Sequence, residues 1–192
     1  MKKLILGLAL TAFCAAPAFA ALKVGDTAPD FTAKASLGGK EFTFSLADSL
    51  KKGPTVVYFY PSAYTGGCDL EAHTFAENSD KFAAAGANII GVSADNMQRL
   101  NQFAADPAFC AGKFPIASDE SLTVAKSYNL NTTPAREGQK DVRGVEIGHG
   151  FIERVTYVVG KDHKIIAVMS SADDKLSPDQ HVMKSLEIVS KK

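Results

Sequence analysis

The sequence lacks the features that mark several large classes of protein. Its 21 basic and 21 acidic side chains balance, and no run of lysine and arginine stands out. A near-neutral surface without a basic patch argues against nucleic acid and against an anionic membrane surface as partners. After the first twenty residues, no apolar run is long enough to cross a bilayer. Neither a Walker loop, a Gly-x-Ser-x-Gly elbow nor a dinucleotide-binding glycine pattern is present.

The first twenty residues are strongly apolar and have the pattern of a secretory signal peptide. Two lysines precede an apolar run from Leu4 to Ala16, and Pro17-Ala18-Phe19-Ala20 offers an Ala-x-Ala cleavage site. The apolar core is too short for a membrane span. We therefore expect residues 1–20 to be a signal peptide that is cleaved after Ala20, and residues 21–192 to be a single domain exported to the bacterial periplasm.

Cysteine is scarce. Cys14 leaves with the signal peptide, so the mature chain keeps only Cys68 and Cys110. An even pair in an oxidising compartment suggests a structural disulfide, but a domain of about 170 residues has a core large enough to fold without one. Spacing alone leaves a structural and a catalytic pair equally open. The Cys-x-x-Cys motif of disulfide oxidoreductases is absent, because Asp69-Leu70-Glu71 follows Cys68.

Apolar, β-branched and aromatic runs predict four strands, with helices between and after them. The last helix is well marked, since Ser177 can cap it, Pro178 fits its first position and Gln180 completes a capping box. The order of these elements predicts an α/β domain with a thioredoxin-like fold, a central mixed sheet flanked by helices. The expected strands are Thr55–Tyr60, Asn88–Val92, Val155–Val159 and Lys164–Met169, and the expected helices are Cys68–Ala85, Asn96–Ala105, Leu122–Tyr128 and the one after Ser177.

Two other stretches bear on function. Thr132–Gly150 has no clear periodicity and many glycine and charged residues, and a loop that long in a compact domain is usually either functional or a sign that an element was not recognised. Phe75 and Phe82 form a stripe on the predicted helix after Cys68, which we expect to face the core rather than to bind a cofactor.

The chemistry is predicted to centre on Cys68. A strand ends at Pro61, a short loop follows, and Cys68 falls in the first turn of a helix, at the sheet edge where ligands bind in α/β folds. The helix N-terminus favours a thiolate, and Thr65 can aim its hydroxyl at whatever the sulfur attacks. Gly66 and Gly67 let a small ligand approach. An inert, buried cysteine is the alternative, but the polar, glycine-flanked loop favours a reactive thiolate.

The pattern Pro61-x-x-x-Thr65-x-x-Cys68 on a strand, loop and helix resembles the active-site signature of the peroxiredoxins. The resemblance extends through most of the mature chain. Glu71 and the overall length look most like the bacterioferritin-comigratory (Q-type) branch. The similar segments are Val24–Phe31, Val56–Pro61, Lys113–Asp119 and Arg154–Ile165.

The resemblance implies a thiol-dependent peroxidase that reduces hydrogen peroxide and organic hydroperoxides. Cys68 would be the peroxidatic cysteine, Thr65 would hold the peroxide, and Pro61 would shield the oxidised sulfur from water. Arg154 would supply a positive charge that lowers the pKa of the thiol. The residues alone also allow that Pro61 ends a strand, that Thr65 caps a helix and that Arg154 forms a surface ion pair.

The resemblance further implies no metal or organic cofactor, because the sulfur carries the electrons, and recycling by a thioredoxin-like protein. Glu71 is expected to be a first-turn acid that complements the helix dipole rather than a proton shuttle. The oligomeric state is left as monomer or homodimer.

The resemblance also bears on the second cysteine. Some Q-type members carry a resolving cysteine five residues after the peroxidatic one, and that position is His73 here. Cys110, just past the Asp106-Pro107 break, would then resolve Cys68. The alternative is a packed thiol between two phenylalanines, which would leave a one-cysteine enzyme.

Two other functions compete with the peroxidase. One is a periplasmic thiol-disulfide oxidoreductase, which normally needs Cys-x-x-Cys. The other is a non-enzymatic thioredoxin-like binding or copper-delivery module, whose second cysteine and ligand histidine are not evident near Cys68. The four histidines at positions 73, 149, 163 and 181 lack metal-ligand spacing, and we expect them to be neutral and solvated.

Overall fold

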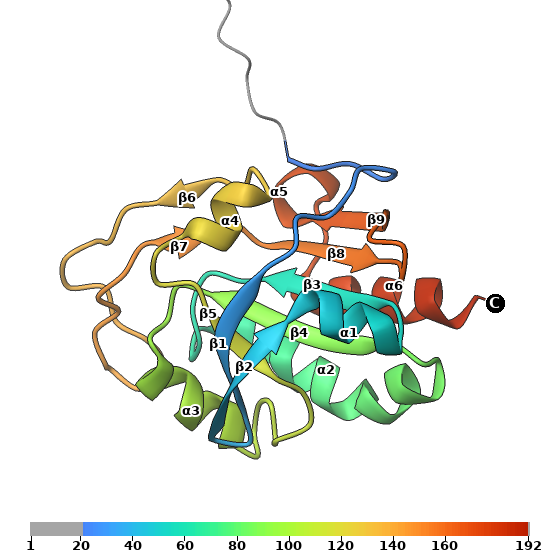
Figure 1. The fold of residues 1–192 in the computed structure, drawn as a ribbon. Helices are drawn as coiled ribbons and strands as arrows, with labels where there is room; N and C mark the ends of the chain where they lie inside the picture. The colour runs from blue at the N-terminus through green and yellow to red at the C-terminus, as the bar shows by residue number, and fades with distance from the viewer. Residues whose placement is uncertain (1–20, 192) are drawn as a thin grey trace, which may run out of the picture.

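A computed structural model describes residues 21–191, so the predicted signal peptide, residues 1–20, lies outside the described residues. The chain folds around a seven-stranded sheet in the order β2-β1-β5-β4-β3-β8-β9 (Figure 1). β3, β4 and β5 run parallel, whereas β8 is antiparallel to β3. The predicted mixed sheet is therefore confirmed. The strands are β1 (Thr32–Leu37), β2 (Lys40–Ser45), β3 (Thr55–Phe59), β4 (Asn88–Ser93), β5 (Ile116–Ser118), β8 (Val155–Val159) and β9 (Ile165–Ser170).

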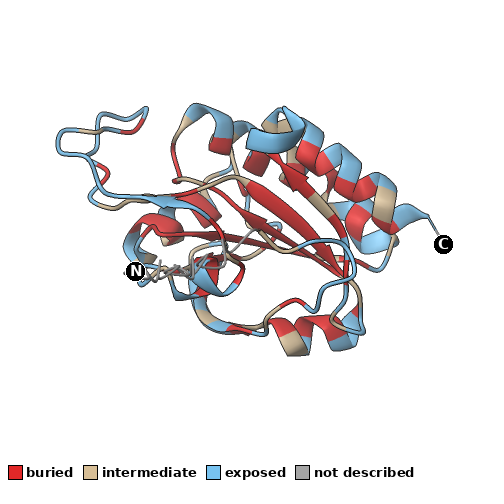
Figure 2. Ribbon diagram, turned by 90° about the horizontal axis from the view of Figure 1, so that it is seen from above, coloured by how far each residue is buried: buried red, intermediate tan, exposed pale blue. Residues whose placement is uncertain are grey.

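Helices cover both faces of the sheet, and each face has its own apolar core. α2 (Gly66–Ala84), α3 (Met97–Ala105) and α6 (Pro178–Ser190) pack on one face, and α1 (Leu46–Lys52) and α4 (Thr123–Ser127) on the other. The central strands are buried, and the helices turn exposed sides outward (Figure 2). The short helix α5 (Ser171–Asp174) follows β9, and β6 (Thr132–Thr133) pairs with β7 (Phe151–Ile152) in a small second sheet. Two layers of helix thus enclose the sheet, which is the arrangement that an α/β fold requires.

β3 shows why its sequence reads as one continuous apolar run. All five of its residues are buried, with Val56 and Tyr58 in the core under α2 and Val57 and Phe59 in the opposite core. A strand covered on both faces needs apolar side chains at every position rather than at alternate ones.

Most of the predicted elements agree with the structure. The predicted strands match β3, β4, β8 and β9 to within one residue at each end, and the capping box of α6 is present. β1 and β2 were not predicted. They form a hairpin joined by Gly38 and Gly39, which both have positive φ. Gly-Gly between two extended runs is a signal for such a turn and could have located the pair.

The sheet register brings three distant parts of the chain to one edge. Phe59, the last residue of β3, lies opposite Val92 on β4 and Val155 on β8. The loop after β3, the residues after β4 and Arg154 before β8 therefore meet at the carboxyl ends of the parallel strands. This is the edge at which α/β folds place their ligand sites.

Candidate active site

Cys68 lies in the first turn of α2, at the edge just described. Thr65 is the N-cap residue of that helix, and its carbonyl oxygen accepts a hydrogen bond from the Cys68 N–H at 2.8 Å. The thiol is almost fully enclosed, with 2 % of the residue exposed, and it belongs to the core under α2. The predicted placement at a helix start is confirmed, but the sulfur is much less accessible than a glycine-flanked loop indicates.

Arg154 reaches the sulfur from the start of β8. Its Nη2 lies 3.1 Å from the Cys68 Sγ, and its Nη1 donates to the carboxylate of Glu71, one turn further along α2. Glu71 is completely buried. The ion pair is therefore internal, so the alternative of a surface pair for Arg154 is wrong. Glu71 was expected to be an acid of the first turn, but Asp69 holds that place and Glu71 lies beyond it, paired with Arg154.

Burial dominates the electrostatics of this trio. Burial raises the pKa of the Glu71 carboxyl to about 8, although the charge of Arg154 and its hydrogen bond act in the opposite direction. Burial also raises the pKa of the Cys68 thiol, against the lowering effects of the Arg154 charge and of hydrogen bonding from the loop. The charge of Arg154 thus acts on the Cys68 pKa in the expected direction, and desolvation acts against it and outweighs it.

The Cys68 thiol, the Glu71 carboxyl and the Arg154 guanidinium are therefore coupled in their charge states. One guanidinium faces two acidic groups, so a proton held on Glu71 leaves the positive charge of Arg154 to the sulfur. Interacting groups of this kind titrate together rather than as independent sites.

Thr65 and Pro61 complete the predicted motif. The Thr65 hydroxyl donates to the carbonyl oxygen of Ser62 at 2.8 Å and makes no capping bond to α2. With its proton used, the Thr65 oxygen can accept a further hydrogen bond. Pro61 stands two residues past the end of β3 and is half-buried, at the start of the loop that leads to Cys68.

Cys110 lies in the turn after α3 and is fully buried in the same core as Cys68. Both thiols are unpaired. Burial, together with Asp106 and Asp69, raises the pKa of Cys110 well above its ordinary value. The neighbouring carbonyl oxygen of Ala108 lies 3.0 Å from Nδ1 of His73 on α2. The turn that holds Cys110 is thus tied to the helix that carries Cys68, but the two sulfurs are not joined.

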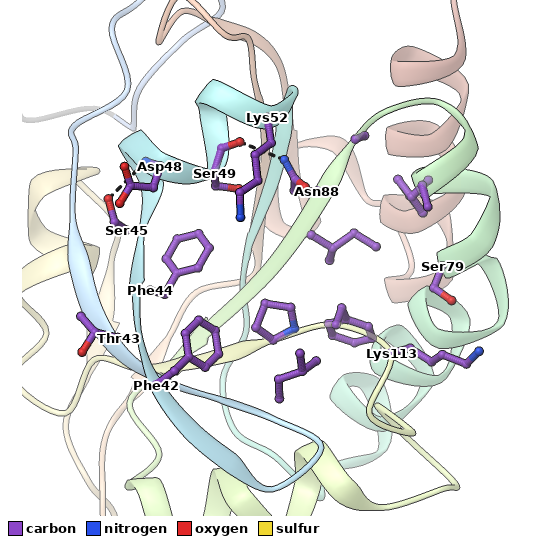
Figure 3. A pocket seen from close by; sticks show the side chains of 17 residues that line it. Phe42, Thr43, Phe44, Ser45, Asp48, Ser49, Lys52, Ser79, Asn88 and Lys113 are labelled. Carbon is purple, nitrogen blue, oxygen red and sulfur yellow. Dashed lines mark hydrogen bonds between the residues drawn. The ribbon is translucent and has the colours of Figure 1, made fainter.

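A large cavity lies away from this site. A cavity of about 530 Å³ opens between β2, α1 and the far end of α2, with Phe42, Phe44, Lys52 and Lys113 among its lining residues (Figure 3). None of the predicted site residues lines it. Among residues 21–191, no group of three or more His, Cys, Asp or Glu side chains is arranged to hold a metal ion, and no helix is long and apolar enough to cross a membrane.

Comparison with known proteins places this geometry in a family. The sequence model of the AhpC/TSA family matches residues 24–168. The chain belongs to the AhpC/TSA family. It is 30 % identical to the chloroplastic peroxiredoxin Q of Sedum lineare, over 89 % of this chain and 80 % of that protein. It is 29 % identical to peroxiredoxin Bcp of Escherichia coli K12, over 83 % of this chain and 91 % of that protein.

Solved structures agree with the family. The crystal structure of peroxidoxin BcpB from Mycobacterium tuberculosis superimposes with a TM-score of 0.71 at 29 % identity, over 88 % of this chain and 96 % of that one. The resemblance to the Q-type branch of the peroxiredoxins and the thioredoxin-like fold are thereby confirmed, and the chain is a peroxiredoxin. The oxidoreductase and binding-module alternatives are not favoured.

Three residues that the sequence analysis did not single out stabilise the loop between β3 and α2 in this peroxiredoxin. Ser62 lies within that loop, and Asp95 and Arg99 contact it from the end of β4 and from α3. The histidine expectation was also partly wrong. His149 pairs with Asp95, and His181 is buried between Thr156 and Ser171, with burial lowering the pKa of its imidazole to about 4. Local sequence patterns give no signal for these contacts, because the partners lie between 10 and 54 residues apart along the chain.

Gly67 lies close to both Pro178 and Arg154. A Cβ at this position would lie 3.4 Å from Nη2 of Arg154 and 3.3 Å from Cγ of Pro178, whereas a Cβ at Gly66 would meet open space. We expect Gly67→Ala to slow peroxide oxidation of Cys68 about tenfold by displacing the guanidinium, and Gly66→Ala by less than about twofold.

Stopped-flow measurement of the second-order rate constant compares these two variants directly. Both gain the helix propensity of alanine, so that the difference between them isolates the crowding at Pro178 and Arg154. Equal rates in the two variants would contradict this account of Gly67.

Proposed function

We propose that this peroxiredoxin reduces hydrogen peroxide and organic hydroperoxides at Cys68, with Thr65, Pro61 and Arg154 as the supporting residues. The observation that carries the proposal is the contact of 3.1 Å between Nη2 of Arg154 and the Cys68 sulfur, at the start of a helix. A fixed positive charge in a water-poor site favours the thiolate and the negative charge that develops on a departing oxygen.

The first step transfers one oxygen atom. The Cys68 thiolate attacks the terminal oxygen of the peroxide, an S–O bond forms and the O–O bond breaks. The remaining oxygen leaves as alkoxide or hydroxide and takes up a proton, giving alcohol or water, and Cys68 becomes a sulfenic acid. The guanidinium of Arg154 lies where it can neutralise the sulfur before attack and the leaving oxygen during it.

Thr65 and Pro61 orient the substrate and limit water. Because the Thr65 hydroxyl donates to the Ser62 carbonyl, its oxygen is left to accept a hydrogen bond from the O–H of the peroxide. Pro61 covers the start of the loop and removes one N–H that would otherwise attract water.

Cys110 is proposed to resolve the sulfenic acid. Its thiol attacks the Cys68 sulfur, a disulfide forms and the sulfenic oxygen leaves as water. Both sulfurs are buried, so that the first turn of α2 or the turn that holds Cys110 must move before they meet within disulfide distance. The high pKa of Cys110 makes it a poor nucleophile until that movement exposes it.

A reductant and a location complete the proposal, the first from the family resemblance and the second from the predicted signal peptide. A thioredoxin-like protein is proposed to reduce the disulfide, with no metal or organic cofactor, and the enzyme to act in the periplasm after cleavage behind Ala20. It would work as a monomer or homodimer.

Mass spectrometry of the mature protein after one equivalent of hydrogen peroxide tests the proposal. We expect a Cys68–Cys110 disulfide in the wild type and a sulfenic acid on Cys68 in Cys110→Ser, because removal of the resolving thiol stops the reaction after the first step. Cys68→Ser should show neither product.

Two other results would change the proposal. Sulfenic acid on Cys68 in both the wild type and Cys110→Ser would make Cys110 a packed bystander and the enzyme a one-cysteine peroxidase. A Cys68 that stays reduced in both proteins would contradict the peroxidase itself.

A further inference from the structure

The segment between β6 and β7, residues 134–150, lies against the loop that leads to Cys68. The N–H of Val142 donates to the carbonyl oxygen of Tyr64 at 3.0 Å. The guanidinium of Arg143 lies over the Tyr64 ring, 3.3 Å from its centroid. A long segment without regular structure thus makes both main-chain and side-chain contacts next to the catalytic residues.

Tyr64 needs such support. It has a φ of 58°, a left-handed conformation that is unfavourable for a residue with a Cβ. Its ring is enclosed by Phe103 at 5.0 Å, Phe109 at 5.5 Å and Arg143. Tyr64 directly precedes Thr65, so the backbone angle at this point sets where α2 begins and where Cys68 lies.

Asp95 holds the first part of the loop, at Ser62 and Ala63. Its buried carboxylate accepts hydrogen bonds from the Ser62 hydroxyl and from the Ala63 N–H, both at 2.8 Å. Nε of Arg99 lies 2.9 Å from the same carboxylate. Nη2 of Arg99 donates to the Ala63 carbonyl and to Asp141 of the segment, both at 2.8 Å. A continuous chain of charged groups therefore connects the segment with the loop.

His149 closes this chain at the far end of the segment. Its Nε2 lies 2.7 Å from Oδ1 of Asp95, and its Nδ1 lies 2.8 Å from the carbonyl oxygen of Gly150. Both partners are acceptors, so both ring nitrogens must carry a proton for both bonds to form. Burial opposes this charge, but the hydrogen bond and the charge of Asp95 outweigh it and raise the pKa of His149 above 6.5.

Other charged groups face the same place. Arg99 approaches from α3, and Asp141, Arg143 and Glu146 belong to the segment itself. The two buried carboxylates, Asp95 and Asp141, are matched by two arginines. Asp69, at the start of α2, interacts with Asp141 and Arg143, and burial raises its pKa to about 6. The imidazole of His149 carries a further positive charge, and its raised pKa keeps that charge to higher pH than in a free histidine. Because the pKa of His149 is raised, the stabilisation that protonated His149 gives to the folded state is fully present below about pH 6.5. This stabilisation is lost as the pH rises through the pKa that His149 has in the folded state.

We infer that His149 is a positioning residue for the peroxidase reaction. In its protonated form it ties residues 134–150 to Asp95, and together they hold Ser62, Ala63 and Tyr64 in the arrangement that places Thr65 and Cys68. Loss of the proton removes one of the two hydrogen bonds and loosens the loop. The bond from protonated His149 to Asp95, which holds residues 134–150 against the loop, is called the latch below. The inference rests on the proposed function for its catalytic consequence, but the latch itself can be measured without peroxide.

Hydrogen exchange of the reduced mature protein tests the latch directly. After correction for intrinsic rates, we expect amides of residues 61–68 to lose about tenfold in protection as the pH rises from about 6 to about 9. His149→Gln keeps a donor toward Asp95 but cannot titrate, so its protection should stay flat over this range. In His149→Ala, the amides of residues 61–68 should have low protection over the whole pH range.

A matched control separates the latch from general loss of stability. His163, in the turn between β8 and β9, has a positive φ that asparagine tolerates, so His163→Asn removes an imidazole without disturbing the loop. It should exchange like the wild type. Exchange in β3 and β8 should be the same in all four proteins. A fall of protection in His149→Gln that matches the wild type would overturn the inference.

The rate of Cys68 oxidation, divided by the thiolate fraction, gives the catalytic consequence. We expect this rate to fall about tenfold in His149→Ala and to be partly rescued in His149→Gln. If Cys68 of the wild type does not react with peroxide, the proposed function fails while the exchange result stands. If Cys68 reacts at the same rate per thiolate in all the variants, the positioning role fails and the peroxidase remains.

Discussion

Arg154→Met is expected to slow oxidation of Cys68 by hydrogen peroxide by about 10²- to 10³-fold, the usual cost of removing one electrostatic donor from a buried site. The residue contacts the sulfur directly, and its charge is the largest of the effects that oppose burial in setting the pKa of Cys68. The pKa of the thiol should rise further in the variant. Stopped-flow kinetics and the pH dependence of thiol alkylation measure the two effects.

Stability changes with the same substitution, because Glu71 loses its partner. Breaking a buried ion pair on one side costs about 3–5 kcal/mol when the remaining group stays charged. Here the cost is smaller at neutral pH, since burial already raises the pKa of Glu71 to about 8 and the carboxyl can take up a proton. The loss should grow as the pH rises above that value.

The double variant Arg154→Met with Glu71→Gln separates catalysis from folding. It removes the unpaired acid, so the urea midpoint should return toward that of the wild type, while the rate stays low. Glu71→Gln alone should lower the pKa of Cys68, because Arg154 then faces a single acidic group. A double variant that recovers the rate would show that Arg154 acts only through stability.

The sequence predicts the position of Cys68 well, because the signal for it is local. A buried strand, Pro61, a short loop and a helix start lie within a few residues, and each has a recognisable pattern. Arg154 is 86 residues away from Cys68, and only the family resemblance brought it to the site. Its position depends on the antiparallel register of β8 on β3, which no local pattern fixes.

The pKa of Cys68 shows where local reasoning reaches its limit. A helix N-terminus favours a thiolate, but how strongly depends on solvent around the sulfur, and burial is a property of the packed molecule. Glu71 was misjudged for the same reason. An acid in the first turn of a helix usually points to water, and only the fold reveals that this one is enclosed beside a guanidinium.

Phe75→Ala should destabilise the protein by about 3–5 kcal/mol, the typical cost of deleting a fully buried phenylalanine side chain. Phe75 has no exposed surface, and its ring stacks on Tyr58 at 4.6 Å and contacts Phe82 and Phe114. It lies two turns beyond Cys68 on the same side of α2, as the predicted core stripe implies. Without this anchor, the helix that carries Cys68 loses its main attachment to β3.

Urea unfolding of the mature protein measures the loss, which should correspond to a fall of roughly 10 °C in the melting temperature. Leu70→Ala is the matched control on the same helix, because Leu70 is 45 % exposed and its truncation should cost within about 0.5 kcal/mol. Phe75→Leu should recover more than half of the loss, since it refills most of the cavity. If Phe75→Ala and Leu70→Ala unfold at the same urea concentration, α2 is held by something other than its aromatic face, and the packing that fixes Cys68 must then come from the loop and from Arg154.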